Sequence, residues 1–309
     1  MEYRQIQWCN TINCDPEQWL KKAHPDTVTW RVMMDIRPLT GSLGAEIIGA
    51  DIKDDQQFEA IYQAFADHSV ITIRGQNIAP EDHLAFARRF GTINVNRFFK
   101  KLDTHPEIAI VLKEKDQKKA IGERWHTDHS HDQVPAMRSI LHAIEVPPFG
   151  GDTVFVSMAD VFENMSNPVK SFLRELKAWH SSRHAFGASQ MTSESSKTGR
   201  IENAHLATQD ALHPIVIRHP LSGREGIYVN PDFTTHIDGI SETESQHILA
   251  MIYDECQKPE YQARVSWSQG DVTMWDNRAT WHKAINDYDG HRRYMHRITV
   301  EGCASSGVD

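Results

Sequence analysis

The chain has 309 residues, of which 39% are hydrophobic and 24% are charged, a composition that can bury a sizeable globular core. The formal net charge is -9 and no run of Lys or Arg occurs, which argues against a nucleic-acid partner. No apolar stretch is long enough to cross a bilayer, and the start lacks a signal-peptide pattern. We therefore expect a cytoplasmic protein with no membrane partner.

The four cysteines are Cys9, Cys14, Cys256 and Cys303, and they form neither a CxxC pair nor a dense disulfide framework. Reduced thiols are therefore expected. A disulfide or metal clip between Cys9 and Cys14 is the alternative, because both residues lie in one short segment.

Residues 1–31 show no sustained hydrophobic period and are predicted to form an N-terminal extension, followed by one domain over 32–303 and a tail over 304–309. Strands are expected at Ala45–Ile48 and Val70–Ile73, and the residues between them repeat apolar side chains at helical spacing. Three more helices are predicted: one from Pro80 to Gly91, one over Pro168–Trp179, and one that starts with the capping box Ser241–Glu244.

Most of the remaining sequence indicates short strands bounded by turns, namely Ile108–Leu112, Ser139–Val146, Thr153–Val156, Pro214–Arg218, Gly226–Asn230, Val272–Trp275 and His296–Val300. This pattern favours a mostly β fold with flanking helices and a closed or double-layered core such as a jelly roll. Residues 187–205 are rich in Ser, Thr, Gly and Glu. A polar loop of this length is typical of a mobile lid over a functional site.

The segment Trp125-His126-Thr127-Asp128 could supply two metal ligands. In a strand, residues two apart project to one face, so His126 and Asp128 could bind one ion, with His282 as a third ligand. Two histidines and one carboxylate leave adjacent coordination positions open, as an oxygen-activating iron centre requires. His129 and His131 have the same spacing, and spacing alone does not choose between the two pairs.

Five motifs in order resemble the TauD/TfdA family, the taurine and aryloxyalkanoate dioxygenases that depend on 2-oxoglutarate. The resemblance extends from about Asp35 to Glu301 and includes the run Arg88-Arg89-Phe90-Gly91. The motifs are Trp125-His126-Thr127-Asp128, Gly150-Gly151-Asp152-Thr153, Trp275-Asp276-Asn277-Arg278, His282, and Arg292-Arg293-x-Met295-His296-Arg297.

This resemblance implies a double-stranded β-helix core that holds Fe(II) through His126, Asp128 and His282. It further implies that Arg293 pairs with the distal carboxylate of 2-oxoglutarate, assisted by the hydroxyl of Thr153, and that O2 is the oxidant. The reaction would hydroxylate a small organic substrate with succinate and CO2 as coproducts. Where the attacked carbon bears sulfur, oxygen or nitrogen, the carbon–heteroatom bond would break.

The expected substrate is anionic, because Arg297 matches the family arginine that meets the substrate's anionic group. Other positions depart from the taurine pattern: Asn96 and Phe99 stand where taurine enzymes place a histidine and a tyrosine, and Gly122 replaces an asparagine. With Phe98 and Phe233, Phe99 could line a wider apolar pocket. We therefore expect a larger or more apolar acid, with a taurine or sulfonate dioxygenase proper as the alternative within the family.

Two readings from other classes compete with this one. A zinc or manganese hydrolase or isomerase could use the same three ligands on the same kind of fold, but it has no need for Arg293 and Thr153. The second competing interpretation is a binding or sensor protein with an inactive site.

The family likeness also suggests a homodimer or homotetramer, although no self-complementary apolar stripe in the sequence proves one.

Overall fold

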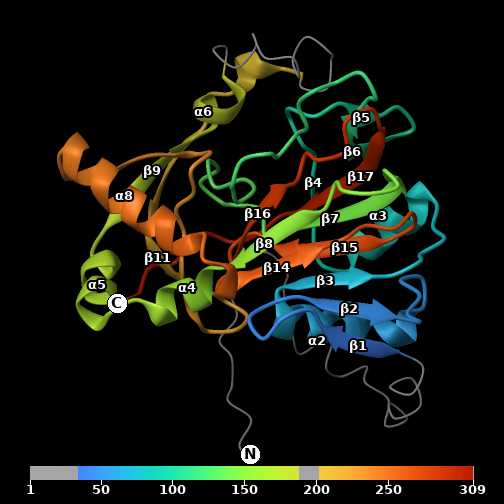
Figure 1. The fold of residues 1–309 in the computed structure, drawn as a ribbon, viewed down its shortest axis with the longest axis horizontal. Coiled ribbons are helices and arrows are strands. Elements are labelled where there is room, and N and C mark those ends of the chain that lie inside the picture. Colours follow the sequence, from blue (N-terminus) through green and yellow to red (C-terminus); the bar gives the residue numbers. More distant parts are fainter. Residues whose placement is uncertain (1–33, 188–201, 309) are drawn as a thin grey trace, which may run out of the picture.

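A computed structural model describes residues 34–187 and 202–308 of the chain. Its architecture is mostly β, with helices on the flanks (Figure 1). The largest sheet has nine strands in the order β1-β2-β3-β15-β7-β17-β6-β5, with β4 paired to β17, and only β2 and β3 pair in parallel. Its strands are β1 (Asp35–Pro38), β2 (Ala45–Ile48), β3 (Val70–Ile73), β4 (Ile93–Asn94), β5 (Lys101–Leu102), β6 (His105–Lys113), β7 (Arg138–Glu145), β15 (Val272–Asp276) and β17 (Arg293–Val300).

A second sheet, in the order β14-β8-β16, packs against the large one. Phe155 and Val265 from the second sheet form one buried cluster with Leu141, Trp275 and Met295 from the large sheet. Both sheets are therefore apolar on their facing sides, as expected for two packed β layers. The strands of the second sheet are β14 (Gln262–Val265), β8 (Thr153–Ser157) and β16 (Thr280–Ala284).

Helices α2 (Phe58–His68) and α3 (Pro80–Arg88) cover the other face of the large sheet. Ile61 and Phe65 of α2 and Leu84 and Phe86 of α3 are buried against strand residues such as Ile140. Pro80 starts α3 because its fixed φ suits the first helical turn and its missing N–H has no partner to lose there. A short 3-10 turn, η2 (Asp55–Gln57), precedes α2.

A third buried cluster lies away from the large sheet, where α4 (Met158–Asn164), α5 (Asn167–Arg174) and α8 (Glu242–Cys256) surround two small sheets. One of these sheets has the order β10-β9-β13 and the other pairs β11 with β12. The remaining elements are β9 (Lys177–Ser181), α6 (Ser182–Phe186), η4 (Ala204–Leu206), β10 (Asp210–Pro214), β11 (Val216–Arg218), β12 (Glu225–Ile227), β13 (Thr234–Ile237) and η5 (Pro259–Tyr261).

The mostly β architecture with flanking helices is confirmed, as are the helices now seen as α2, α3 and α8. The capping box at α8 is also present: Ser241 Oγ accepts from the backbone N–H of Glu244, and the Glu244 carboxylate accepts from that of Ser241. The helix predicted over Pro168–Trp179 was wrong in its second half, because it ends at Arg174. Lys177–Ser181 forms β9 instead, held on both sides by β10 and β13.

Several predicted strands differ from the structure in their bounds: β6 and β17 each begin three residues before the expected start, at His105 and Arg293. The strand expected at Pro214–Arg218 is divided at Ile215, because Pro214 ends β10 and β11 starts at Val216. Residues Tyr228–Asn230, expected at the end of a strand, lie beyond β12 and lead into a turn, where the Asn230 side chain accepts from the backbone N–H of Phe233. Such local side-chain bonding competes with strand pairing.

Some sequence predictions fall outside the described residues: the N-terminal extension up to residue 31, Cys9 and Cys14, and residues 188–201 of the expected lid. Cys256 and Cys303 are reduced thiols. Within the described ranges, no helix is both long and apolar enough to cross a bilayer.

Candidate active site

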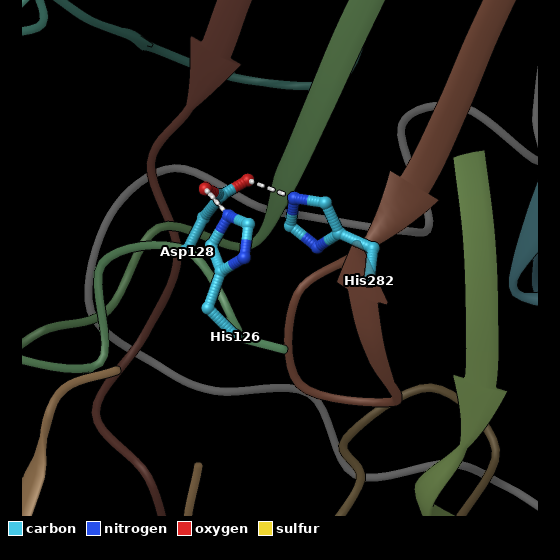
Figure 2. A group of neighbouring side chains, drawn as sticks. All are labelled: His126, Asp128 and His282. Atoms are coloured by element: carbon cyan, nitrogen blue, oxygen red, sulfur yellow. Dashed lines mark ion pairs between the residues drawn. The ribbon is translucent and has the colours of Figure 1, made fainter. Parts of the chain in front are cut away.

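The side chains of His126, Asp128 and His282 converge on one point (Figure 2), in a cavity lined by residues of both packed sheets. Nε2 of His126 lies 3.6 Å from Asp128 Oδ1, and Nε2 of His282 lies 3.6 Å from Asp128 Oδ2. These separations are too long for hydrogen bonds. They suit donors that share one ion with bonds of about 2.1 Å.

His126 lies in an isolated bridge and Asp128 in the turn that follows it, so the predicted strand geometry was wrong. His126 makes an isolated bridge with His282 in β16, through reciprocal backbone hydrogen bonds of 3.1 and 2.8 Å. After it the chain turns, and the Thr127 hydroxyl lies within hydrogen-bond distance of the carbonyl oxygens of Asn277 and Thr280. This buried hydroxyl fixes the turn to the β15–β16 connection and so directs Asp128 toward both imidazoles.

Different forces orient the two imidazoles. Nδ1 of His126 lies 2.8 Å from the carbonyl oxygen of Arg124, and a carbonyl only accepts, so Nδ1 carries the proton and Nε2 keeps its lone pair. The ring of His282 is held by packing, with the Trp275 ring 4.8 Å away and the Phe155 ring stacked at 6.0 Å. Both Nε2 atoms are therefore directed at the Asp128 carboxylate.

The charge of Asp128 is stabilised although the residue is buried. Burial would raise the pKa of this carboxyl, but the charge of Arg297 and the neighbouring imidazoles of His282 and His126 hold it well below its usual range. Arg297 Nη2 lies 2.8 Å from Oδ2, and the hydroxyl of Ser139 donates to the same oxygen at 2.8 Å. Asp128 is thus an oriented anion, and burial lowers the pKa of His282 well below its usual value.

Arg293 and Thr153 line the same cavity from β17 and β8. Arg293 is 5% exposed, and among the described residues its side chain donates one hydrogen bond, from Nε to the carbonyl oxygen of Gly151. No carboxylate among these residues lies within ion-pair distance of its guanidinium, and burial lowers its pKa. The hydroxyl of Thr153 accepts from Trp267 Nε1 at 3.1 Å, which leaves its own proton available to a ligand.

One cavity of about 830 Å³, measured with its open mouth, collects every site residue proposed from the sequence. Asn96, Phe99 and Phe233 line it together with Arg297 and the three ligand-type residues. Asn96 also has a structural role, because its side-chain oxygen accepts from the backbone N–H groups of Phe98 and Phe99. The competing pair His129 and His131 lies at the same cavity, where it forms a second group with Asp132.

Comparisons with known proteins agree with this geometry. The family model described as "Taurine catabolism dioxygenase TauD, TfdA family" matches residues 35–299. The chain belongs to the TauD/TfdA family. It is 31% identical to an alpha-ketoglutarate-dependent sulfate ester dioxygenase of Pseudomonas putida, over 89% of this chain and 92% of that protein. It is 30% identical to an alkylsulfatase of Acinetobacter baylyi, over 89% and 87% of the two chains. A taurine dioxygenase from Burkholderia xenovorans superposes with a TM-score of 0.74 at 28% identity, covering 89% of this chain and 93% of that one.

As a member of the TauD/TfdA family, the chain is an alpha-ketoglutarate-dependent dioxygenase, which uses Fe(II), 2-oxoglutarate (alpha-ketoglutarate) and O2. The donor set fits such an iron: two imidazoles and one carboxylate meet at the wall of an open cavity. The buried guanidinium of Arg293 fits the second carboxylate of a dicarboxylic acid, because the described residues give it no carboxylate partner and a buried charge requires a counter-charge.

Sequence reasoning missed three residues at this TauD/TfdA-family site. Ser139, which donates to Asp128, is the second residue of β7 and belongs to no motif. Trp267, which donates to Thr153, lies in a loop before β15. Phe186, at the end of α6, lines the cavity beside Phe98, with the two rings stacked at 4.5 Å. No local pattern could have found them, because each reaches the site through tertiary packing.

Proposed function

We propose that this dioxygenase holds Fe(II) through His126, Asp128 and His282 and hydroxylates a small anionic organic molecule. The observation that carries the proposal is one cavity that contains both this ligand set and the buried guanidinium of Arg293. When bound, iron and 2-oxoglutarate supply the oxidant that introduces one oxygen atom of O2 into a C–H bond, with succinate and CO2 as coproducts.

Arg293 and Thr153 would bind the distal carboxylate of 2-oxoglutarate. A guanidinium presents two parallel N–H donors that match both oxygens of a carboxylate, and the Thr153 hydroxyl adds a third donor. Gly151 and Trp267 support the proposal, because their contacts fix the guanidinium and the hydroxyl before the cosubstrate arrives.

Arg297 would meet the anionic group of the substrate, and Asn96, Phe99 and Phe233 would line its pocket. Arg297 and Arg293 both face the cavity from β17, about 13 Å apart along an extended strand. That spacing leaves room for the metal ligands between a cosubstrate end and a substrate end. Phe98, Phe99, Phe186 and Phe233 make the substrate end apolar, which favours an anion with an apolar body over taurine.

The relatives named for sulfate esters make such esters, with aryloxy acids, the first substrates to test. Hydroxylation of the carbon that bears the ester oxygen gives an unstable product. That product releases sulfate and leaves an aldehyde or ketone, so the net reaction is cleavage of a C–O bond.

The proposal extends to the architecture and its setting. We propose that the two facing sheets form the double-stranded β-helix of a single domain over 32–303, preceded by the extension at 1–31 and followed by the tail at 304–309. The close packing of β14-β8-β16 against the large sheet supports this assignment. A cytoplasmic location and a homodimer or homotetramer stay predictions.

The deciding experiment adds Fe(II) and 2-oxoglutarate to the protein without oxygen and records the visible spectrum. A weak charge-transfer band is expected in the wild type, and it should be absent in His282→Ala. Succinate formation is then measured in air with alkyl sulfates, sulfonates and phenoxyacetates. If the protein forms no band but hydrolyses or isomerises a substrate with zinc or manganese, it is a metal-dependent hydrolase or isomerase. If it forms the band but turns over no substrate, it is a binding or sensor protein with an inactive site.

A further inference from the structure

A buried histidine lies in the apolar wall of the cavity without a hydrogen-bond partner. His131 is 2% exposed, and neither of its ring nitrogens has a hydrogen-bond partner among residues 34–187 and 202–308; the Asp132 carboxylate lies 4.0 Å from its Nε2. Its ring contacts those of Phe98, Phe186 and Phe233, with centroids 6.2, 6.1 and 4.8 Å away. A purely apolar wall would use a phenylalanine here, because an imidazole without partners keeps the full cost of its desolvation.

A second histidine of the same cavity is fixed so that one nitrogen stays free. His129 Nδ1 lies 2.9 Å from Asp132 Oδ2, and Asp132 also pairs with the guanidinium of Arg97. Nε2 of His129 makes no hydrogen bond to any described residue, and the residue lines the cavity. Its backbone is left-handed, with φ of 61°, a conformation that costs free energy for a non-glycine residue and is often retained at functional sites.

Both histidines belong to the substrate end of the cavity rather than to the cosubstrate end, since the ring of His129 stacks on that of His131 with centroids 5.7 Å apart. His131 contacts the phenylalanines of the substrate wall, and Phe99 of that wall lies 5.6 Å from the guanidinium of Arg297. The contacts of Arg293 are instead with Gly151 and, at 5.5 Å, with the ring of Trp267. Among the described residues, no ring contact or hydrogen bond joins His131 and its phenylalanines to Arg293, Gly151 or Trp267.

We infer that His129 and His131 form a second polar subsite, which binds a hydroxyl group carried on the apolar body of the anionic substrate. This inference rests on the proposed function and adds to it a second recognition point beyond the anionic group. Each histidine then acts as a specificity-determining residue and not as a catalytic one.

A hydroxyl fits better than a charged group. A neutral imidazole offers one donor and one acceptor, and a hydroxyl both accepts and donates. Burial lowers the pKa of His131 to about 3, so the ring is neutral near pH 7 and provides no positive charge for a second carboxylate. A metal ion bound by His129, His131 and Asp132 is disfavoured, because the Arg97 guanidinium already neutralises that carboxylate.

The test uses pairs of anions that differ by one hydroxyl: hexyl sulfate against its terminally hydroxylated counterpart, and phenoxyacetate against its para-hydroxylated counterpart. Binding to protein loaded with Mn(II) and 2-oxoglutarate is measured by calorimetry for the wild type, His131→Phe and His180→Phe. His180 is the matched control, because it is a buried histidine with an unpartnered nitrogen that does not line the cavity. Metal binding to each variant is titrated in the same way.

The wild type should bind the hydroxylated member of at least one pair roughly tenfold more tightly, the effect of one net hydrogen bond. His131→Phe should reduce that ratio to about one while binding the member without the hydroxyl at least as well, and His180→Phe should keep the preference. The inference is overturned if the wild type shows no preference in either pair, if the preference survives His131→Phe, or if the protein takes up a second Mn(II) that His131→Phe removes. Binding with the expected ratio but without succinate formation would instead reject the proposed function and keep the subsite.

Discussion

Arg297 Nη2 lies 2.8 Å from Oδ2 of Asp128, so the arginine proposed to bind the substrate anion also contacts a proposed iron ligand. We predict that Arg297→Gln raises the KM for an anionic substrate by tenfold or more, because a charge-assisted hydrogen bond is lost. The KM for 2-oxoglutarate should change little. Initial rates of succinate formation measure both.

Ser139→Ala distinguishes the binding of the substrate anion by Arg297 from the orientation of Asp128. It removes a hydrogen bond to the same Asp128 oxygen but keeps the guanidinium and its charge, so it should weaken metal binding by about tenfold and alter substrate KM less than Arg297→Gln does. An unchanged substrate KM in Arg297→Gln would show that Arg297 serves only to orient Asp128.

Arg293→Lys should raise the KM for 2-oxoglutarate by roughly tenfold to a hundredfold, because lysine cannot present two parallel donors to a carboxylate. Titration of the charge-transfer band with 2-oxoglutarate should give the same factor. Arg292→Lys is the matched control: Arg292 is adjacent in sequence but pairs at the surface with Glu114 and Glu145, and such pairs contribute at most about 1 kcal/mol. Equal effects of the two substitutions would contradict the cosubstrate role.

The fold could be predicted from the sequence where local and tertiary preferences agree. The helix α8 was predicted from its capping box, and β15 from a short apolar run of β-formers. The helix predicted over Pro168–Trp179 failed in its second half because Lys177–Trp179 can continue a helix, and only pairing with β10 and β13 makes those residues a strand. Local propensity carries no information about that pairing.

The site was predictable to the extent that its residues occur in motifs. His126, Asp128 and Thr153 are such residues, and they line one cavity. Spacing alone could not choose between His126 with Asp128 and His129 with His131, because both pairs are two residues apart. The turn after His126 separates them: it brings Asp128 to His282, while Asp132 accepts from His129. Long-range packing therefore determines which of the two pairs lies beside His282.

His142 should make the stability of the protein depend on pH. Burial is the larger cause that lowers the pKa of His142 from 6.5 to about 4, and the nearby His296 is the second. Asp271 has a smaller effect that raises it. The ring of His83 packs against that of His142, with centroids 5.8 Å apart. The folded state thus favours the neutral ring, so stability is fully present above pH 6.5 and is lost as the pH falls toward 4. At pH 5 the loss from this residue is about 2 kcal/mol.

Urea unfolding at pH 7 and pH 5 measures this effect. In His142→Gln the free energy of unfolding should fall less between the two pH values than in the wild type, by about 2 kcal/mol. Equal pH dependence in the two proteins would mean that His142 is already protonated in the folded state at pH 5.

Gly122 should control the position of His126. A Cβ at this position would lie 3.3 Å from Cε1 of the His126 ring, and its φ of +81° already disfavours a side chain. Gly122→Ala should therefore cost about 1 to 2 kcal/mol of stability through the backbone and also weaken metal binding by displacing the imidazole. Gly239→Ala is the matched control, because Gly239 has a φ of +77° and no atom within 4 Å of the added Cβ. It should lose a similar free energy of unfolding and keep the wild-type affinity for Mn(II). If both variants keep the wild-type affinity for Mn(II), the residue at position 122 does not affect the position of His126. If both variants lose affinity, the loss results from general destabilisation.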